Sequence, residues 1–126
     1  MAYRYTYAAR LNSFRNGDWG GKKPTVIDLV ERASKVPGLK AVDLNFPDHV
    51  QGTSVADLKA CLARTGIGLN GLAMRYYTEP GFKLGAFTHP DKAVRRLPGG
   101  LPKCGVLAVR ELGRKLITFW MGNDGY

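Results

Sequence analysis

The pattern of apolar and polar positions predicts a chain in which strands and helices alternate. Four runs are rich in aromatic, β-branched and other apolar side chains and predict strands: residues 5–14, 39–46, 67–77 and 114–121. The segments between these runs carry apolar residues near helical spacing. Such an order is typical of parallel βαβ units, whose right-handed crossovers would place the helices on one face of a curling sheet.

Capping residues locate the first two helices. Thr25 with Asp28 three positions later comes close to a capping box and predicts the start of the first helix, which ends at the Pro-Gly pair of residues 37–38. Ser54 is the expected N-cap of the second helix, and Gly66 closes it as a C-cap.

The third helix is predicted from about His89 to Leu112, with Thr88 as its cap, and it contains an irregular break. Residues 97–102 read Leu-Pro-Gly-Gly-Leu-Pro. In a helix interior these residues would cost about 3 kcal/mol for each proline and about 1 kcal/mol for each glycine. Two interpretations stay open: a loop that separates two short helices, or a local frame-shift in the coding sequence.

These elements predict an α/β fold of parallel (β/α) repeats with about four strands and three helices. Both a doubly wound three-layer sheet and half of a (β/α)₈ barrel fit this order. The chain has 126 residues, whereas a complete barrel needs about 250. We therefore expect residues 1–126 to form a single partial domain. The chain has neither a GxGxxG motif after the first strand nor a Walker loop, so a nucleotide site has no support.

Charge and cysteine content narrow the function only slightly. The formal net charge is +9, but the basic residues are scattered, and this distribution favours a solvated surface over a nucleic-acid interface. Residues 75–77, Arg-Tyr-Tyr, are the one weak hint of nucleic-acid binding. Cys61 and Cys104 have no metal-ligand spacing. We see no signal peptide and no apolar run of membrane-spanning length, and we expect a cytoplasmic protein with no membrane partner.

Six short segments, taken in order, carry a family resemblance. They are RLNSF at 10–14, VPGL at 36–39, VDLNFPDH at 42–49, LNGLAMRY at 69–76, KLGAFTHPD at 83–91 and TFWMGNDGY at 118–126. Together they resemble the xylose-isomerase-like TIM-barrel family, specifically its sugar isomerases and epimerases related to L-rhamnose isomerase. Residues 97–102 depart from that family, which carries a regular helix there.

The resemblance implies a (β/α)₈ barrel that interconverts aldoses and ketoses, or epimerises ketoses, with a divalent cation such as Mn²⁺, Mg²⁺ or Co²⁺. It also implies that this chain is the N-terminal half, because the family's metal ligands come from strands five to eight. We therefore expect the fragment of a metal-dependent sugar isomerase, inactive alone, with a sugar as its ligand and no cofactor bound by this chain itself.

Ligands of such barrels bind at the C-terminal ends of the strands. Among the residues at or after the strand ends, we choose six candidate substrate-binding residues: Asn12, Asn45, His49, Arg75, Trp120 and Asp124. The resemblance adds His89 as the catalytic candidate, because it matches a family histidine that hydrogen-bonds the sugar and helps ring opening.

Each candidate also has a plainer interpretation. His89 and His49 could be exposed and idle, Trp120 could pack in the core, and Arg75 could be a structural ion-pair partner. Asp124 could be disordered so near the terminus. Asp43, inside a strand expected to be buried on both faces, is predicted to pair with a lysine or arginine. The acids and histidines form no known metal-ligand spacing.

Two other functions stay open. A half-barrel exposes two edge strands and an apolar interior, so the chain could be a stand-alone binding module that dimerises through those edges. A basic nucleic-acid-binding protein is the third and weaker alternative, and we regard nucleic acid as an unexpected partner.

Overall fold

The computed structural model describes residues 5–122 and confirms the alternating order of strands and helices. The elements are β1 (Tyr7–Arg10), α1 (Val26–Ser34), β2 (Leu39–Phe46), α2 (Val55–Thr65), β3 (Gly68–Arg75), α3 (Lys92–Arg96), α4 (Gly100–Glu111) and β4 (Ile117–Trp120). Three 3₁₀ turns, Leu11–Phe14, Pro80–Phe82 and Leu97–Gly99, connect them. Helices α3 and α4 and the turn between them occupy the place of the predicted third helix. Within residues 5–122, no helix has the length and apolar character needed to cross a bilayer.

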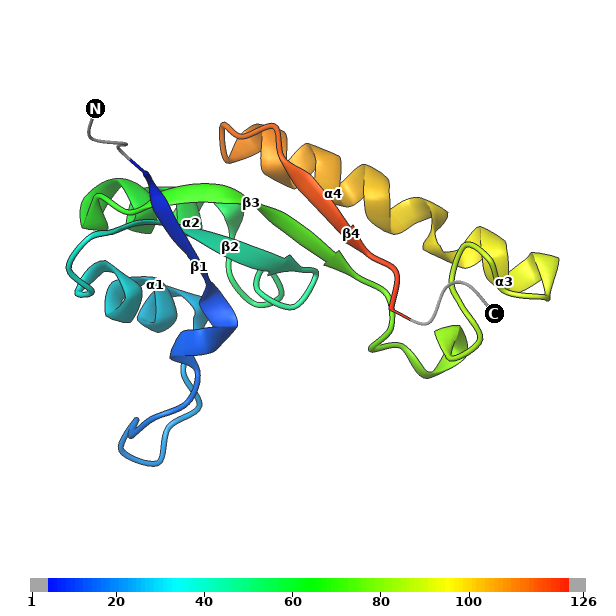
Figure 1. Cartoon of the computed structure of the whole chain (residues 1–126), viewed down its shortest axis with the longest axis horizontal. Helices are drawn as coiled ribbons and strands as arrows, with labels where there is room; N and C mark the ends of the chain where they lie inside the picture. The colour runs from blue at the N-terminus through cyan, green and yellow to red at the C-terminus, as the bar shows by residue number, and fades with distance from the viewer. Residues whose placement is uncertain (1–4, 123–126) are drawn as a thin grey trace.

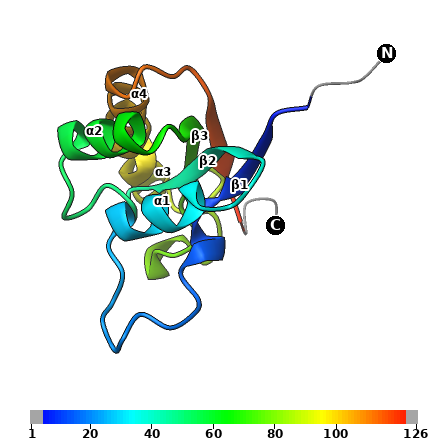
Figure 2. The same cartoon turned by 90° about the vertical axis from the view of Figure 1, so that its left-hand side faces the viewer.

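The four strands form one open parallel sheet in the order β1-β2-β3-β4. All the helices lie on one face of this sheet, as Figure 2 shows, and the other face, which Figure 1 looks onto, carries none. A doubly wound sheet would have helices on both faces. The described residues therefore have the arrangement of consecutive (β/α) repeats, with all strand C-terminal ends at the same edge.

The predicted helix caps of α1 and α2 are confirmed. The Asp28 amide donates to Thr25 Oγ1 at 3.2 Å, and the Thr25 amide donates to the Asp28 carboxylate at 2.8 Å, which completes a capping box. The Asp57 amide donates to Ser54 Oγ at 3.0 Å. Gly66 ends α2 with φ of 70°, a conformation that costs a glycine little.

The third helical segment begins later than predicted. Thr88 is not its cap, because α3 starts at Lys92, where Asp91 Oδ1 accepts a hydrogen bond from the Ala93 amide at 2.7 Å. The Asp91 amide itself donates to His89 Nδ1 at 3.0 Å. His89 therefore belongs to the turn that precedes the helix.

The irregular segment predicted at residues 97–102 is shorter in the structure and is not a loop. Residues 97–99 form a single 3₁₀ turn, and α4 begins directly after it at Gly100. Pro102 is the third residue of α4, within the first turn, where backbone N–H groups have no intrahelical acceptor and a proline removes no bond. Pro98 is fully buried, so the turn packs into the fold.

Three strands are shorter than their apolar runs suggest, and the third run, 67–77, forms β3 only over Gly68–Arg75. The first run, 5–14, continues beyond β1 into the 3₁₀ turn Leu11–Phe14, whose Leu11 is fully buried under the sheet edge. The fourth run, 114–121, forms a strand only over Ile117–Trp120. In the first run, Leu11 and Phe14 pack into or against the core beyond the ladder of the sheet.

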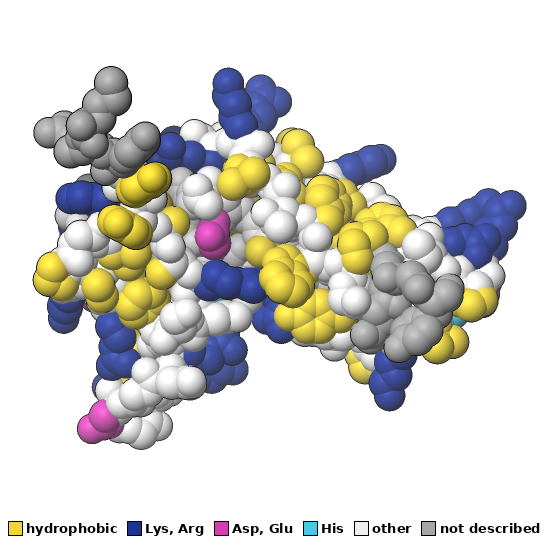
Figure 3. Space-filling model, viewed as in Figure 1, with side chains coloured by type: hydrophobic (Ala, Val, Ile, Leu, Met, Phe, Trp, Pro, Cys, Tyr) yellow, Lys and Arg dark blue, Asp and Glu magenta, His cyan; other side chains and the backbone are white. Residues whose placement is uncertain are grey.

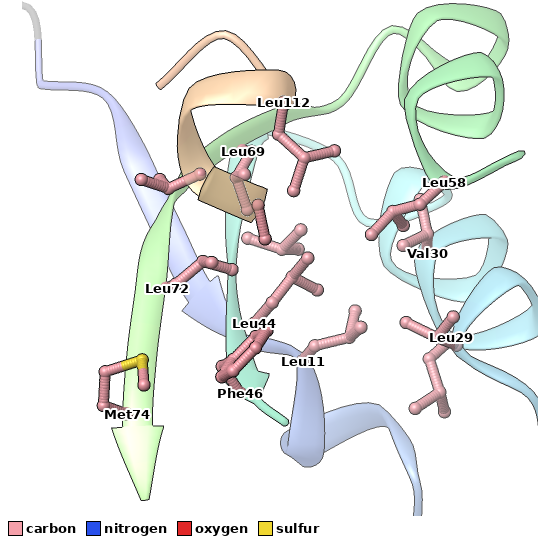
Figure 4. Packing of buried hydrophobic residues seen from close by; sticks show 14 of the residues in the cluster. Leu11, Leu29, Val30, Leu44, Phe46, Leu58, Leu69, Leu72, Met74 and Leu112 are labelled. Carbon is pink, nitrogen blue, oxygen red and sulfur yellow. The ribbon is translucent and has the colours of Figure 1, made fainter. Parts of the chain in front are cut away.

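The core lies between the sheet and the helices. Leu44 of β2 and Leu72 of β3 meet Val30 of α1 and Leu58 of α2, all at most 1 % exposed (Figure 4). Burial of each such side chain contributes about 1.5–3 kcal/mol. Helix α4 approaches β3 at Gly105, where an added Cβ would lie 2.6 Å from Met74 Sδ.

The uncovered face of the sheet differs from the apolar interior expected of a half-barrel. Arg10, Asp43, Asn70 and Thr118 line a cleft there, whereas core residues of the same strands point toward the helices. Figure 3 shows acidic and basic side chains among hydrophobic ones on this face. The face is therefore chemically mixed and suits a polar ligand better than a dry hydrophobic contact.

A β-bulge in β3 determines which side chains of this strand line the cleft. Val42 pairs with Leu69, but the next residue of β2, Asp43, pairs with Gly71, so Asn70 is an extra residue in β3. A bulge changes the phase of side-chain alternation and redirects the side chain at that point. Asn70 and Ala73 consequently line the same cleft although they are three positions apart.

Candidate functional site

His49 and Asn45 form a closed loop at the C-terminal end of β2. The Asn45 amide donates to His49 Nδ1 at 2.9 Å, and the His49 amide donates to the Asn45 carbonyl at the same distance. The Phe46–Pro47 peptide bond between them is cis. His49 is only 3 % exposed, so the interpretation of an exposed loop histidine is wrong.

Asn12 completes the hydrogen bonding of this imidazole. Asn12 Oδ1 lies 2.8 Å from His49 Nε2. Because Nδ1 accepts from a backbone amide, the ring proton resides on Nε2, which donates to Asn12. Burial, and secondarily the positive charge of Arg15, lowers the pKa of His49 to about 4. The imidazole is therefore neutral at physiological pH and holds the β1 and β2 ends together.

Asn45 connects this pair to Arg10 and Trp120. Its Oδ1 accepts a hydrogen bond from the Arg10 guanidinium at 3.1 Å, and the guanidinium carbon lies 4.9 Å from the centre of the Trp120 ring. The Asn45 Nδ2 group is buried without a hydrogen-bond partner. Such a donor costs about 1–3 kcal/mol when unpaired, and a polar ligand reaching the cluster would satisfy it.

Arg75 bridges β3 to the loop after β2. Its guanidinium donates to Asp48 Oδ2 at 2.8 Å and, through Nε, to the Tyr77 hydroxyl at 3.0 Å. The guanidinium also lies 5.0 Å from the centre of the Tyr77 ring. Its charge is thus compensated within the protein, which agrees with the ion-pair interpretation and weakens the hint of nucleic-acid binding at residues 75–77.

A cleft with a volume of about 200 Å³ opens on the uncovered face of the sheet. It is lined by Arg10, Asp43, Asn70, Ala73, Thr118 and Trp120. Asp43 Oδ1 accepts a hydrogen bond from Asn70 Nδ2 at 2.8 Å. The expected ion pair of Asp43 is therefore wrong, because the hydrogen-bond partner of its carboxyl group is a neutral amide.

The structure gathers most of the predicted site residues at one edge of the sheet. Asn12, Asn45 and His49 are directly bonded, Trp120 joins them through Arg10, and Arg75 holds the neighbouring Asp48. Trp120 is 45 % exposed, so it is not a core residue.

Two predicted residues stand apart from this group. His89 is half-buried, and its hydrogen bonds stay within its own turn and with Arg95. Its interpretation as a residue beside a helix start fits the structure, and we assign it no catalytic role. Asp124 lies outside the described residues.

Sequence reasoning missed Arg10, Asn70 and Thr118 as site residues. The signal that could have found them is their polarity within strands that should be apolar, since strands of a fully covered parallel sheet read as nearly continuous apolar runs. Each of these side chains turns to the face of the sheet that the helices leave open.

The described residues do not supply a metal centre. No group of three or more histidine, cysteine, aspartate or glutamate side chains within residues 5–122 is placed to share an ion. The side chains within this range therefore do not fit the divalent cation that the family resemblance implies. No protein-family model matches the chain, so the resemblance supports a proposal only.

Proposed function

We propose that this chain is the sugar-binding part of a xylose-isomerase-like isomerase or epimerase, and that the sugar binds in the cleft on the open face of the sheet. The observation that carries this proposal is the lining of that cleft. An acid, an amide, a guanidinium and a hydroxyl surround one exposed indole ring. Polar groups of this kind hydrogen-bond sugar hydroxyls, and an aromatic face covers the C–H groups of a pyranose or furanose ring.

Each side chain has a definite part in this proposal. The Asp43 carboxylate accepts hydrogen bonds from sugar hydroxyls, while Asn70, fixed against Asp43, offers both an acceptor and a donor. Arg10 keeps donors for the ligand while one of them is held by Asn45. Trp120 supplies the apolar wall.

The His49 network supports the site indirectly. His49 joins Asn12 after β1 to Asn45 at the end of β2, and Asn45 in turn orients Arg10. His49 is a positioning residue in this proposal, since its two ring nitrogens are both occupied within the protein. Side chains held by such bonds lose less entropy when a ligand arrives.

The described residues hold and orient a sugar in this proposal but do not move its protons. Neither His49, with both nitrogens engaged, nor His89, in the turn before α3, is placed as a base beside the cleft. Isomerisation would require groups other than those lining the cleft, so binding and not turnover is the property to measure on this chain.

Nuclear magnetic resonance of the ¹⁵N-labelled chain tests the proposal. Neutral aldose and ketose pairs, a pentose, a hexose and a 6-deoxyhexose, are titrated and the amide shifts followed. We expect saturable shifts at residues 70, 118 and 120. Trp120→Ala is expected to weaken binding at least about tenfold, as a buried aromatic contact worth over 1.4 kcal/mol does.

Trp19→Ala is the matched control, because Trp19 lies in the loop after β1, against Arg32 rather than in the cleft. It is expected to leave sugar affinity unchanged. Equal losses in both variants, or no saturable shift with any sugar up to molar concentration, would contradict sugar binding at this cleft.

A second candidate function, a module that dimerises through its edges, is favoured by the two edge strands. Tyr7 on β1 is 64 % exposed and Phe119 on β4 is 47 % exposed. An exposed strand edge with apolar side chains is a template for pairing with another chain. If this candidate is correct, sedimentation equilibrium shows a dimer whose fraction rises with protein concentration. The Phe119→Lys variant is then a monomer. A monomer at all concentrations excludes it.

A further inference from the structure

A second and larger cleft lies between the loop after β1 and the loop after β2. Its volume is about 400 Å³, within the range of about 300–1,000 Å³ that small-molecule sites occupy. The polar or charged side chains that line it are Arg15, Lys23, Thr25, Asp48, His49, Gln51 and Thr53. It shares no lining residue with the cleft on the open face.

The cations of this cleft lack partners within the protein. Within residues 5–122, the side chains of Arg15 and Lys23 take part in no ion pair or hydrogen bond, whereas the two acids nearby are engaged. Asp48, which lines the cleft, is held by Arg75. Asp28, at the start of α1, is bonded to Thr25 and is not among the residues that line the cleft. Among the side chains that line the cleft, the charges of Arg15 and Lys23 are therefore not compensated by an ion pair.

Neutral donors stand beside these cations. Gln51 and Thr53 line the cleft, and neither side chain has a hydrogen-bond partner among the described residues. His49 forms a buried wall, and its pKa is lowered, after burial, chiefly by the charge of Arg15. That influence indicates that the positive potential of Arg15 reaches the cleft wall.

We propose that this cleft binds the oxyanion group, phosphoryl or carboxylate, of a small polar molecule. Arg15 and Lys23 contribute charge, and Gln51 and Thr53 donate hydrogen bonds to the oxygens. Because the cleft is larger than one phosphate requires, the group belongs to a larger molecule whose body occupies the remaining space. The proposal stands apart from sugar binding on the open face, since the two clefts have separate linings.

Four probes separate the sources of the oxyanion: inorganic phosphate, a hexose phosphate, a hexose uronate and the same hexose without an acidic group. Each is titrated into the ¹⁵N-labelled chain at constant ionic strength, with chloride as the balancing salt. We expect the amides of residues 15, 23 and 49–53 to shift with the hexose phosphate or the uronate, and the tighter of the two identifies the oxyanion. Inorganic phosphate binds more weakly than either.

Arg15→Ala and Lys23→Ala are each expected to weaken that binding at least about tenfold, the usual loss for a hydrogen bond to a charged group. Lys103→Ala removes the same charge from an exposed position on α4 and is expected to change affinity less than twofold. The melting temperature of each variant without ligand checks that the fold is intact.

Two results would overturn the proposal. One is the absence of saturable shifts at residues 15, 23 and 49–53 with every acidic probe. The other is an equal loss in the Arg15, Lys23 and Lys103 variants, which would mean general counter-ion attraction to a basic protein. Shifts at residues 70, 118 and 120 with the neutral hexose report on the other cleft, so failure of one proposal is distinguishable from failure of the other.

Discussion

His49 Nε2 and Asn12 Oδ1 lie 2.8 Å apart and join the loops that follow β1 and β2. The contact has a fixed direction, because the Asn45 amide already donates to the other ring nitrogen. A neutral imidazole with its proton on Nε2 satisfies both bonds, and a doubly protonated ring would set two donors, the Asn45 amide and Nδ1–H, against each other. The hydrogen bond between His49 and Asn12 therefore depends on the protonation state of the His49 ring, and so on pH.

The first prediction concerns stability in mild acid. The pKa of His49 is lowered to about 4 in the folded chain, against 6.5 for an unperturbed histidine. Below pH 6.5 His49 binds a proton in the unfolded chain but not in the folded chain. The free energy of unfolding therefore falls as the pH drops toward 4. The expected loss from this residue is up to about 3 kcal/mol, measured by urea unfolding at several pH values.

His49→Gln isolates that contribution, since glutamine keeps polar groups near the same positions and does not titrate. The variant is expected to be less stable at pH 7 but to lose less stability between pH 6.5 and pH 4 than the natural chain. Parallel pH profiles for the two chains would contradict the neutral, buried imidazole.

The second prediction compares two glycines of α4. A Cβ at Gly105 would lie 2.6 Å from Met74 Sδ and 3.0 Å from its Cε, whereas a Cβ at Gly100 meets no atom within 4 Å. Gly105→Ala is expected to destabilise the chain by about 1–3 kcal/mol through overpacking against a buried side chain. Gly100→Ala is expected to be neutral or slightly stabilising. Thermal unfolding of both variants decides this, and equal melting temperatures would be inconsistent with α4 packing on β3 at Gly105.

The third prediction ranks the two ion pairs of residues 5–122. The side chains of Arg75 and Asp48 are 16 % and 32 % exposed, whereas those of Arg64 and Glu31 are 60 % and 41 % exposed. Asp48→Asn is expected to cost about 1 kcal/mol of unfolding free energy, because water screens this pair less. Glu31→Gln is expected to leave the unfolding midpoint in urea unchanged. The reverse order would show that the contact between β3 and the loop after β2 does not stabilise the fold.

Features set by local chemistry were predictable from the sequence. The Thr25–Asp28 capping box, the Ser54 cap and the Gly66 terminus each depend on residues within a few positions of one another, and all three are confirmed. The parallel order of the sheet followed from the alternation of strand and helix patterns.

Features set by distant contacts were not predictable. The bulge at Asn70 arises from pairing between β2 and β3, and it decides which side chains face the open cleft. The burial of His49 depends on Asn12, which is far away in the chain. Residues 100–102 are helical for a local reason that the prediction overlooked, since Gly100 and Pro102 fall in the first turn of α4, where a proline removes no intrahelical bond.

The central proposal is that the open face of the sheet binds a sugar against Trp120. The most direct measurement is the indole N–H resonance of Trp120 during titration with neutral monosaccharides, with Trp19, the other of the chain's two tryptophans, as an internal reference. We expect a saturable shift of the Trp120 indole with at least one aldose–ketose pair and a stationary Trp19 indole. A Trp120 indole that does not move with any sugar, or that moves only together with Trp19, would contradict it.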